Sequence, residues 1–154
     1  MIDISSYNWL KKIFHEIKFE NLPHGIIISG PKGIGKKLLS YKISSNLLLN
    51  KSTKNFDKEL FYSKNHPDFF VINKEKILLK HITYRKNIKK DDWDEELGER
   101  NVNDFLFGTP SIAINKVALI VNAHTMNKES QNALLKSLEE PASNTYIIMT
   151  VDRP

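Results

Sequence analysis

The glycine-rich segment GIIISGPKGIGKK contains the residues of this chain whose types and spacing best suit a chemical task. Gly30, Gly33 and Gly35 allow the backbone to fold back so that successive amide N–H groups point at one spot. Lys36 places a positive charge beside them, at the expected start of a helix. The spacing fits the P-loop pattern up to Lys36, and this pattern predicts a cradle for the phosphate groups of a nucleotide.

The groups that would hold magnesium at such a cradle are missing. A P-loop ATPase has a serine or threonine after the loop lysine and two adjacent acids at the end of a neighbouring strand. Lys37, Val121 and Asn122 occupy these three positions, and we interpret them as a solvated lysine, a core residue and a polar strand end. Loss of a positioned general base alone costs ~10²–10⁴-fold in rate. We therefore predict no catalytic residue, negligible ATP hydrolysis, and weak binding of ATP, ADP or phosphate through the loop amides and Lys36.

Four short apolar runs predict the strands that position this cradle. They are Gly25–Ser29, Phe69–Ile72, Lys116–Val121 and Tyr146–Thr150. The runs do not alternate between polar and apolar residues, which is typical of strands covered on both faces, and the first is expected to be a central strand. Because helical patterns alternate with the runs, the sequence predicts an α/β fold with a parallel sheet flanked by helices.

Apolar residues at three- and four-residue spacing predict the helices. The expected spans are Ser5 or Ser6 to Asn21, the P-loop to Asn50, 102–107, and Asn127 to Pro141. The polar, mixed stretch 51–65 carries no predicted element. His66 precedes a proline and is expected to be a turn residue, because no cysteine or second spaced histidine lies near it to form a metal site.

Residues 74–100 contain a basic block followed by an acidic block. The basic residues are Lys74, Lys76, Lys80, Arg85, Lys86, Lys89 and Lys90. The acidic residues are Asp91, Asp92, Asp94, Glu95, Glu96 and Glu99. Local neutralisation between the blocks favours a solvated insertion or loop. The alternative is a stand-alone basic module that binds DNA through its phosphate backbone.

Bulk properties set limits on the class of protein. The 154 residues suit a single domain, and 23 basic against 18 acidic residues give a net charge of +5, which permits an acidic partner such as DNA. The absence of cysteine excludes disulfides and a thiolate zinc site. No signal peptide or membrane-spanning run is present, so a cytoplasmic location is expected.

Several motifs together resemble the bacterial clamp-loader AAA+ family, and within it most closely the delta-prime subunits of DNA polymerase III. They are LPHGIIISGPKGIGKK, the HPDFF run at 66–70, Lys116-Val117 and the NALLKSLEEP run at 132–141. The resemblance covers 1–154 as one AAA+ nucleotide-binding-like core domain, with 74–100 as a divergent insertion. The lid and collar domains of that family are absent from this chain.

The resemblance implies a non-hydrolysing subunit of the polymerase III holoenzyme that helps load the sliding clamp onto primed DNA. The implied partners are gamma/tau and delta clamp-loader subunits, indirectly the sliding clamp, and primer–template DNA, with no membrane. Thr150 or Asp152 falls where the family places its sensor residue. The family's zinc module has no counterpart in 50–65, and Arg153 does not occupy the arginine-finger position. An ATP-hydrolysing subunit of the gamma/tau type is the alternative.

Overall fold

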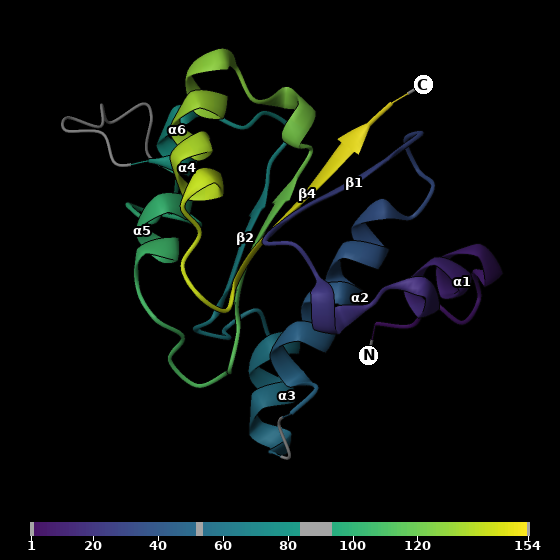
Figure 1. Ribbon diagram of the computed structural model, residues 1–154. Coiled ribbons are helices and arrows are strands. Elements are labelled where there is room, and N and C mark those ends of the chain that lie inside the picture. Colours follow the sequence, from purple (N-terminus) through teal and green to yellow (C-terminus); the bar gives the residue numbers. More distant parts are fainter. Residues whose placement is uncertain (1, 52–53, 84–93, 154) are drawn as a thin grey trace.

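A single four-stranded parallel sheet forms the centre of the molecule (Figure 1). The structure, a computed structural model, describes residues 2–51, 54–83 and 94–153. The strands are β1 (Gly25–Gly30), β2 (Phe69–Asn73), β3 (Lys116–Val121) and β4 (Thr145–Asp152). Their order across the sheet is β1-β4-β3-β2, and every neighbouring pair is parallel. The predicted α/β fold class is therefore confirmed.

Helices cover both faces of the sheet (Figure 1). One face carries α1 (Asn8–Glu16), α2 (Lys36–Leu49) and α3 (Asn55–Tyr62). The other carries α4 (Leu79–Ile82), α5 (Val102–Phe107) and α6 (Lys128–Glu139). Two short 3₁₀ turns, η1 (Phe19–Asn21) and η3 (Ala123–Thr125), connect these elements. No helix in the described ranges is long and apolar enough to cross a lipid bilayer.

The core consists of two apolar layers separated by the sheet. Successive side chains of a strand point to opposite faces. Val117, Leu119 and Val121 of β3 therefore join the layer under α1, α2 and α3. Ala118 and Ile120 join the layer under α4, α5 and α6. All six residues of β3 are buried, so this strand has the two-sided burial that its unbroken apolar run predicts.

The prediction that β1 is a central strand is wrong. In the described sheet β1 pairs with β4 alone and lies at the edge, while β3 and β4 are the central strands. Ile26 and Ile28 pack against the α2 layer, whereas the Ile27 side chain is 60% exposed on the opposite face. An apolar run shows that a strand is suited to burial, but it does not determine where the strand lies in the sheet.

The helices agree with the predicted spans in part. α2, α5 and α6 begin and end close to the expected residues, and the Asn127 side chain accepts a hydrogen bond from the amide of Ser130 at the start of α6. α1 is shorter than predicted because Ile17 is extended, with φ −73° and ψ 122°. α3 was not predicted, and its apolar contribution is centred on the buried side chain of Phe61.

The ends of the 74–100 segment belong to the core, which corrects its interpretation as a solvated insertion. Ile77, Ile82 and Leu97 are buried in the layer with α5 and α6. Across the segment, the Lys74 ammonium lies 3.0 Å from a carboxylate oxygen of Asp94 and 2.9 Å from one of Glu96. The predicted neutralisation between the blocks is thus present at Lys74. The predicted basic residues Arg85, Lys86, Lys89 and Lys90, and the acidic residues Asp91 and Asp92, lie outside the described residues.

Candidate functional site

The glycine-rich loop connects the end of β1 to the start of α2. Gly33 and Gly35 adopt φ angles of 83° and 94°, a left-handed backbone region that side chains with a Cβ rarely adopt. A Cβ at Gly35 would also lie 3.0 Å from the Leu10 side chain, whereas one at Gly33 would contact nothing within 4 Å. Gly30 is different, because a Cβ there would meet Ile34 at an ordinary 3.5 Å. Two of the three predicted glycines are therefore required by the loop geometry.

Alanine substitutions at these two glycines separate backbone strain from side-chain crowding. Gly33→Ala is expected to destabilise the protein by about 1 kcal/mol, the usual cost of a left-handed residue with a Cβ. Gly35→Ala carries the same strain plus the contact with Leu10, so we expect about 2–3 kcal/mol. Urea unfolding of the two variants measures the difference. Equal destabilisation by both would show that α1 does not restrict the loop.

The Lys36 ammonium is bound entirely within the chain. Its Nζ donates to the carbonyl oxygens of Gly30 at 2.9 Å and Pro31 at 2.6 Å, and it lies 2.8 Å from a carboxylate oxygen of Asp152. The residue is only 8% exposed. The ion pair with Lys36 lowers the pKa of the Asp152 carboxyl, chiefly through the hydrogen bond between them. A lysine ammonium has three N–H donors, and three acceptors surround this one.

A cavity of about 710 Å³ opens beside the loop at the carboxyl ends of the strands. Gly33, Gly35, Lys36 and Lys37 contribute one wall. The ends of β2, β3 and β4 contribute Asn73, Val121, Asn122, Thr150 and Asp152. The structure therefore brings together six of the predicted site residues, from two segments far apart in the sequence. Gly30, the seventh, shapes the start of the loop without lining the cavity.

These residues do not fit a magnesium site. Magnesium in proteins prefers carboxylate and hydroxyl oxygens. Lys37 is exposed at the position of the hydroxyl, and Val121 is 5% exposed within the apolar layer of α2. Among the described residues that line the cavity, Asp152 alone carries a carboxylate, and that group is paired with Lys36.

Asn122 connects the end of β3 to neighbouring segments through hydrogen bonds. It adopts a left-handed conformation with φ 61°, and its amide N–H donates to the Thr150 hydroxyl at 3.1 Å. Its side-chain Nδ2 donates to the carbonyl oxygen of Lys74 at 3.1 Å. Asn122 thus ties the end of β3 to β4 and to the segment that follows β2. Thr150, one of the two predicted sensor residues, is an acceptor in this network.

The HPDFF motif holds the loop that precedes β3. The Asp68 carboxylate is completely buried and accepts hydrogen bonds from the amides of Ser111, Ile112 and Ala113 at 2.5, 2.8 and 2.7 Å. The His66 Nδ1 accepts from the Asp68 amide at 3.1 Å, which agrees with its prediction as a turn residue. Burial lowers the pKa of His66. The contacts of the motif are structural, and it lies at the amino ends of the strands, away from the P-loop.

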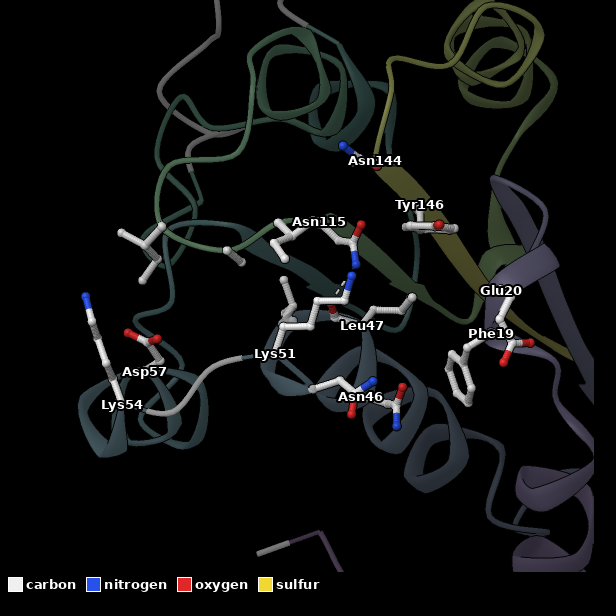
Figure 2. A pocket seen from close by; sticks show the side chains of 15 residues that line it. Phe19, Glu20, Asn46, Leu47, Lys51, Lys54, Asp57, Asn115, Asn144 and Tyr146 are labelled. Carbon is white, nitrogen blue, oxygen red and sulfur yellow. Dashed lines mark hydrogen bonds between the residues drawn. The ribbon is translucent and has the colours of Figure 1, made fainter.

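A second cavity, of about 490 Å³, opens at those amino ends (Figure 2). Asn46 of α2 and Lys51, just after α2, line it together with Asn115, Asn144 and Tyr146 near the strand ends. The Asn115 side chain donates to the carbonyl oxygen of Leu47 at 2.8 Å, which joins the start of β3 to α2. Glu20, Lys54 and Asp57 also line this pocket, but none of the predicted site residues does. The P-loop cavity is therefore the better candidate site.

The fold and the loop first define the class of this protein. It is a P-loop-type α/β module with a glycine-rich loop between β1 and α2, and the described residues of its cavity do not fit a magnesium site. Over residues 6–154 the sequence also matches the family described as "DNA polymerase III, delta subunit", and the chain belongs to that family. The family resemblance that the motifs predict is thus confirmed.

Individual relatives agree with this assignment. The protein named DNA polymerase III subunit delta' from Pseudomonas aeruginosa is 30% identical over 137 residues, which are 85% of this chain and 38% of that protein. The protein of the same name from Buchnera aphidicola subsp. Baizongia pistaciae is 30% identical over 154 residues, covering 93% of this chain and 44% of that protein. The chain thus spans less than half the length of these relatives.

A solved structure is similar in fold. The crystal structure of a DNA polymerase III gamma subunit-related protein from Thermotoga maritima matches with a TM-score of 0.57 and 21% identity. The match covers 95% of this chain and 39% of that protein. At this level of identity the likeness supports the P-loop α/β fold and carries no assignment of activity.

Proposed function

We propose that this chain is the P-loop core of a non-catalytic clamp-loader subunit of DNA polymerase III, which helps place the sliding clamp on primed DNA. The observation that carries the proposal is the P-loop site itself: its glycine-rich loop suits a phosphate group, while Lys37, Val121 and Asn122 stand where magnesium ligands are needed. Membership of the DNA polymerase III delta-subunit family supports the choice of complex.

In this proposal the module acts through its shape and its contacts with neighbouring subunits. Its partners are clamp-loader subunits of the gamma/tau and delta types, with the sliding clamp and primer–template DNA reached through the complex. The burial of β3 on both faces of the sheet and the Asn122 connections favour a rigid body. ATP hydrolysis is then left to other subunits.

Two alternatives are less well supported. Hydrolysis by this chain would need magnesium ligands that the cavity residues do not supply. A stand-alone DNA-binding module would depend on the basic residues of 74–90, and Lys74 is already paired with Asp94 and Glu96. Salt-dependent DNA affinity that is lost on neutralising these lysines would favour the second alternative.

Co-purification tests the proposal. The intact protein that carries this chain is tagged in its own cells, and the retained proteins are identified by mass spectrometry. We expect clamp-loader ATPase subunits in stoichiometric amounts, and a reconstituted complex that hydrolyses ATP at the same rate with Lys36→Ala as with the original residue. Absence of those subunits, or loss of ATPase activity with Lys36→Ala in an intact complex, would contradict the proposal.

A further inference from the structure

The ion pair between Lys36 and Asp152 engages the ammonium group of the loop lysine. In a P-loop the lysine ammonium binds the anionic ligand. Here its three donors are directed at the carbonyl oxygens of Gly30 and Pro31 and at the Asp152 carboxylate. A phosphate therefore has no ammonium donor available until one of these contacts breaks.

The position of Asp152 is fixed by the sheet. Asp152 is the last residue of β4 and is in register with Gly30, the last residue of β1. The next amide, of Arg153, donates to the carbonyl oxygen of Gly30 at 3.0 Å. The Asp152 amide donates to Nδ1 of His124 at 3.1 Å, so the backbone at residue 152 is held from both sides. The pairing of β4 with β1 therefore places the Asp152 carboxylate beside Lys36.

The remaining charges around the cavity are favourable to an anion. Lys32, Lys37 and Lys64 line the cavity together with Lys36, and Asp152 is the one carboxylate among its described lining residues. Without that carboxylate the cavity would present four positive side chains and the loop amides. A single negative charge from the chain itself therefore opposes the binding of phosphate.

We propose that the Asp152 carboxylate is an internal occupant of the P-loop, which competes with phosphate for Lys36 and keeps the site closed to nucleotide. The inference rests on the proposed function in one respect, because it takes the loop to be a non-hydrolysing phosphate cradle. It adds a reason for the loop to bind phosphate weakly. Replacing the carboxylate by a neutral group of the same shape opens the site.

Titration with inorganic pyrophosphate, without magnesium, tests this inference on the intact protein. We expect Asp152→Asn to bind pyrophosphate at least ten-fold more tightly than the original protein, as measured by calorimetry at low ionic strength. Asp152→Ser should change affinity in the same direction. Glu139→Gln is the matched control, because it removes one negative charge from an exposed position at the end of α6 and should leave affinity within two-fold. Adding Lys36→Met to Asp152→Asn should abolish the gain.

Two results would overturn the inference. One is an unchanged affinity in both Asp152 variants. The other is an equal gain in Glu139→Gln, which would reduce the effect to net charge. Thermal unfolding without ligand is run beside each titration, and loss of folding in both Asp152 variants would show that the carboxylate is structural, which also counts against the inference. Turnover of ATP by the original protein would contradict the proposed function alone, so the two failures are distinguishable.

Discussion

Asp68→Ala is expected to destabilise the protein by about 2–4 kcal/mol. The Asp68 carboxylate is fully buried and receives three backbone hydrogen bonds from Ser111, Ile112 and Ala113. Hydrogen bonds to a charged acceptor contribute roughly 1.5–3 kcal/mol each, and a donor left without a partner costs a further 1–3 kcal/mol if it stays buried. Ser111 and Ile112 are exposed residues, so water can hydrogen-bond to their amides in the variant. The destabilisation is therefore smaller than the sum of the three hydrogen bonds.

The measurement is a thermal and urea unfolding series. For a chain of this size the predicted loss corresponds to a fall in Tm of roughly 5–15 °C. The Asp68→Asn side chain keeps one acceptor oxygen and the same shape. The stability of this variant should therefore lie between that of Asp68→Ala and that of the original protein. Glu75→Ala, at an exposed turn, is the control and should change stability by less than about 0.5 kcal/mol. A small effect of Asp68→Ala would show that the loop before β3 is held by other contacts.

Asp94 is expected to make the protein sensitive to strong acid. Burial opposes ionisation of this carboxyl, but hydrogen bonds from the Leu97 amide and the Lys74 ammonium outweigh it and lower the pKa from 3.8 to about 2. A carboxyl with a lowered pKa in the folded protein stabilises the fold above its unfolded pKa of 3.8, and this contribution is lost as the pH falls through about 2. The shift corresponds to on the order of 2 kcal/mol.

Comparison with Asp94→Asn isolates this contribution. At pH 6 the original protein should be more stable than the variant by about 2 kcal/mol, and the difference should shrink between pH 4 and pH 2. Burial also lowers the pKa values of His66 and His81, so the stability that these groups contribute is lost from about pH 6.5 downward. His81 lies 3.6 Å from Asp94, which raises its pKa, so the Asp94 charge is read from the change in the difference below pH 4. A difference that stays constant down to pH 2 would contradict the role assigned to the Asp94 charge.

Residue patterns predicted the elements of this fold better than their arrangement. The four apolar runs became the four strands. The apolar periodicity of α2 and α6, together with the Asn127 cap of α6, predicted the spans of these helices. Helix α3 was not predicted, because Phe61 is its one buried residue and a single apolar position gives no helical periodicity. The edge position of β1 was missed for a different reason. Strand order depends on which strands pair with one another, and residues far apart in the sequence decide that pairing through tertiary packing.

The candidate site shows the same division. The loop spacing predicted a tight glycine-rich turn before Lys36, and the structure shows one, with left-handed Gly33 and Gly35. Phosphate binding by this loop, and the lack of a magnesium site at Lys37, Val121 and Asn122, stay predictions. The pairing of Lys36 with Asp152 was not predicted. It requires the register of β4 against β1, in which Gly30 stands beside Asp152, and no local pattern encodes that register.

Magnesium-dependent ATP turnover by the intact, purified protein is the most direct test of the central claim that the cradle has been kept without its catalytic groups. The expected result is no release of phosphate above the level of a Lys36→Ala variant, with or without magnesium. Turnover that requires magnesium and disappears in Lys36→Ala would contradict the account.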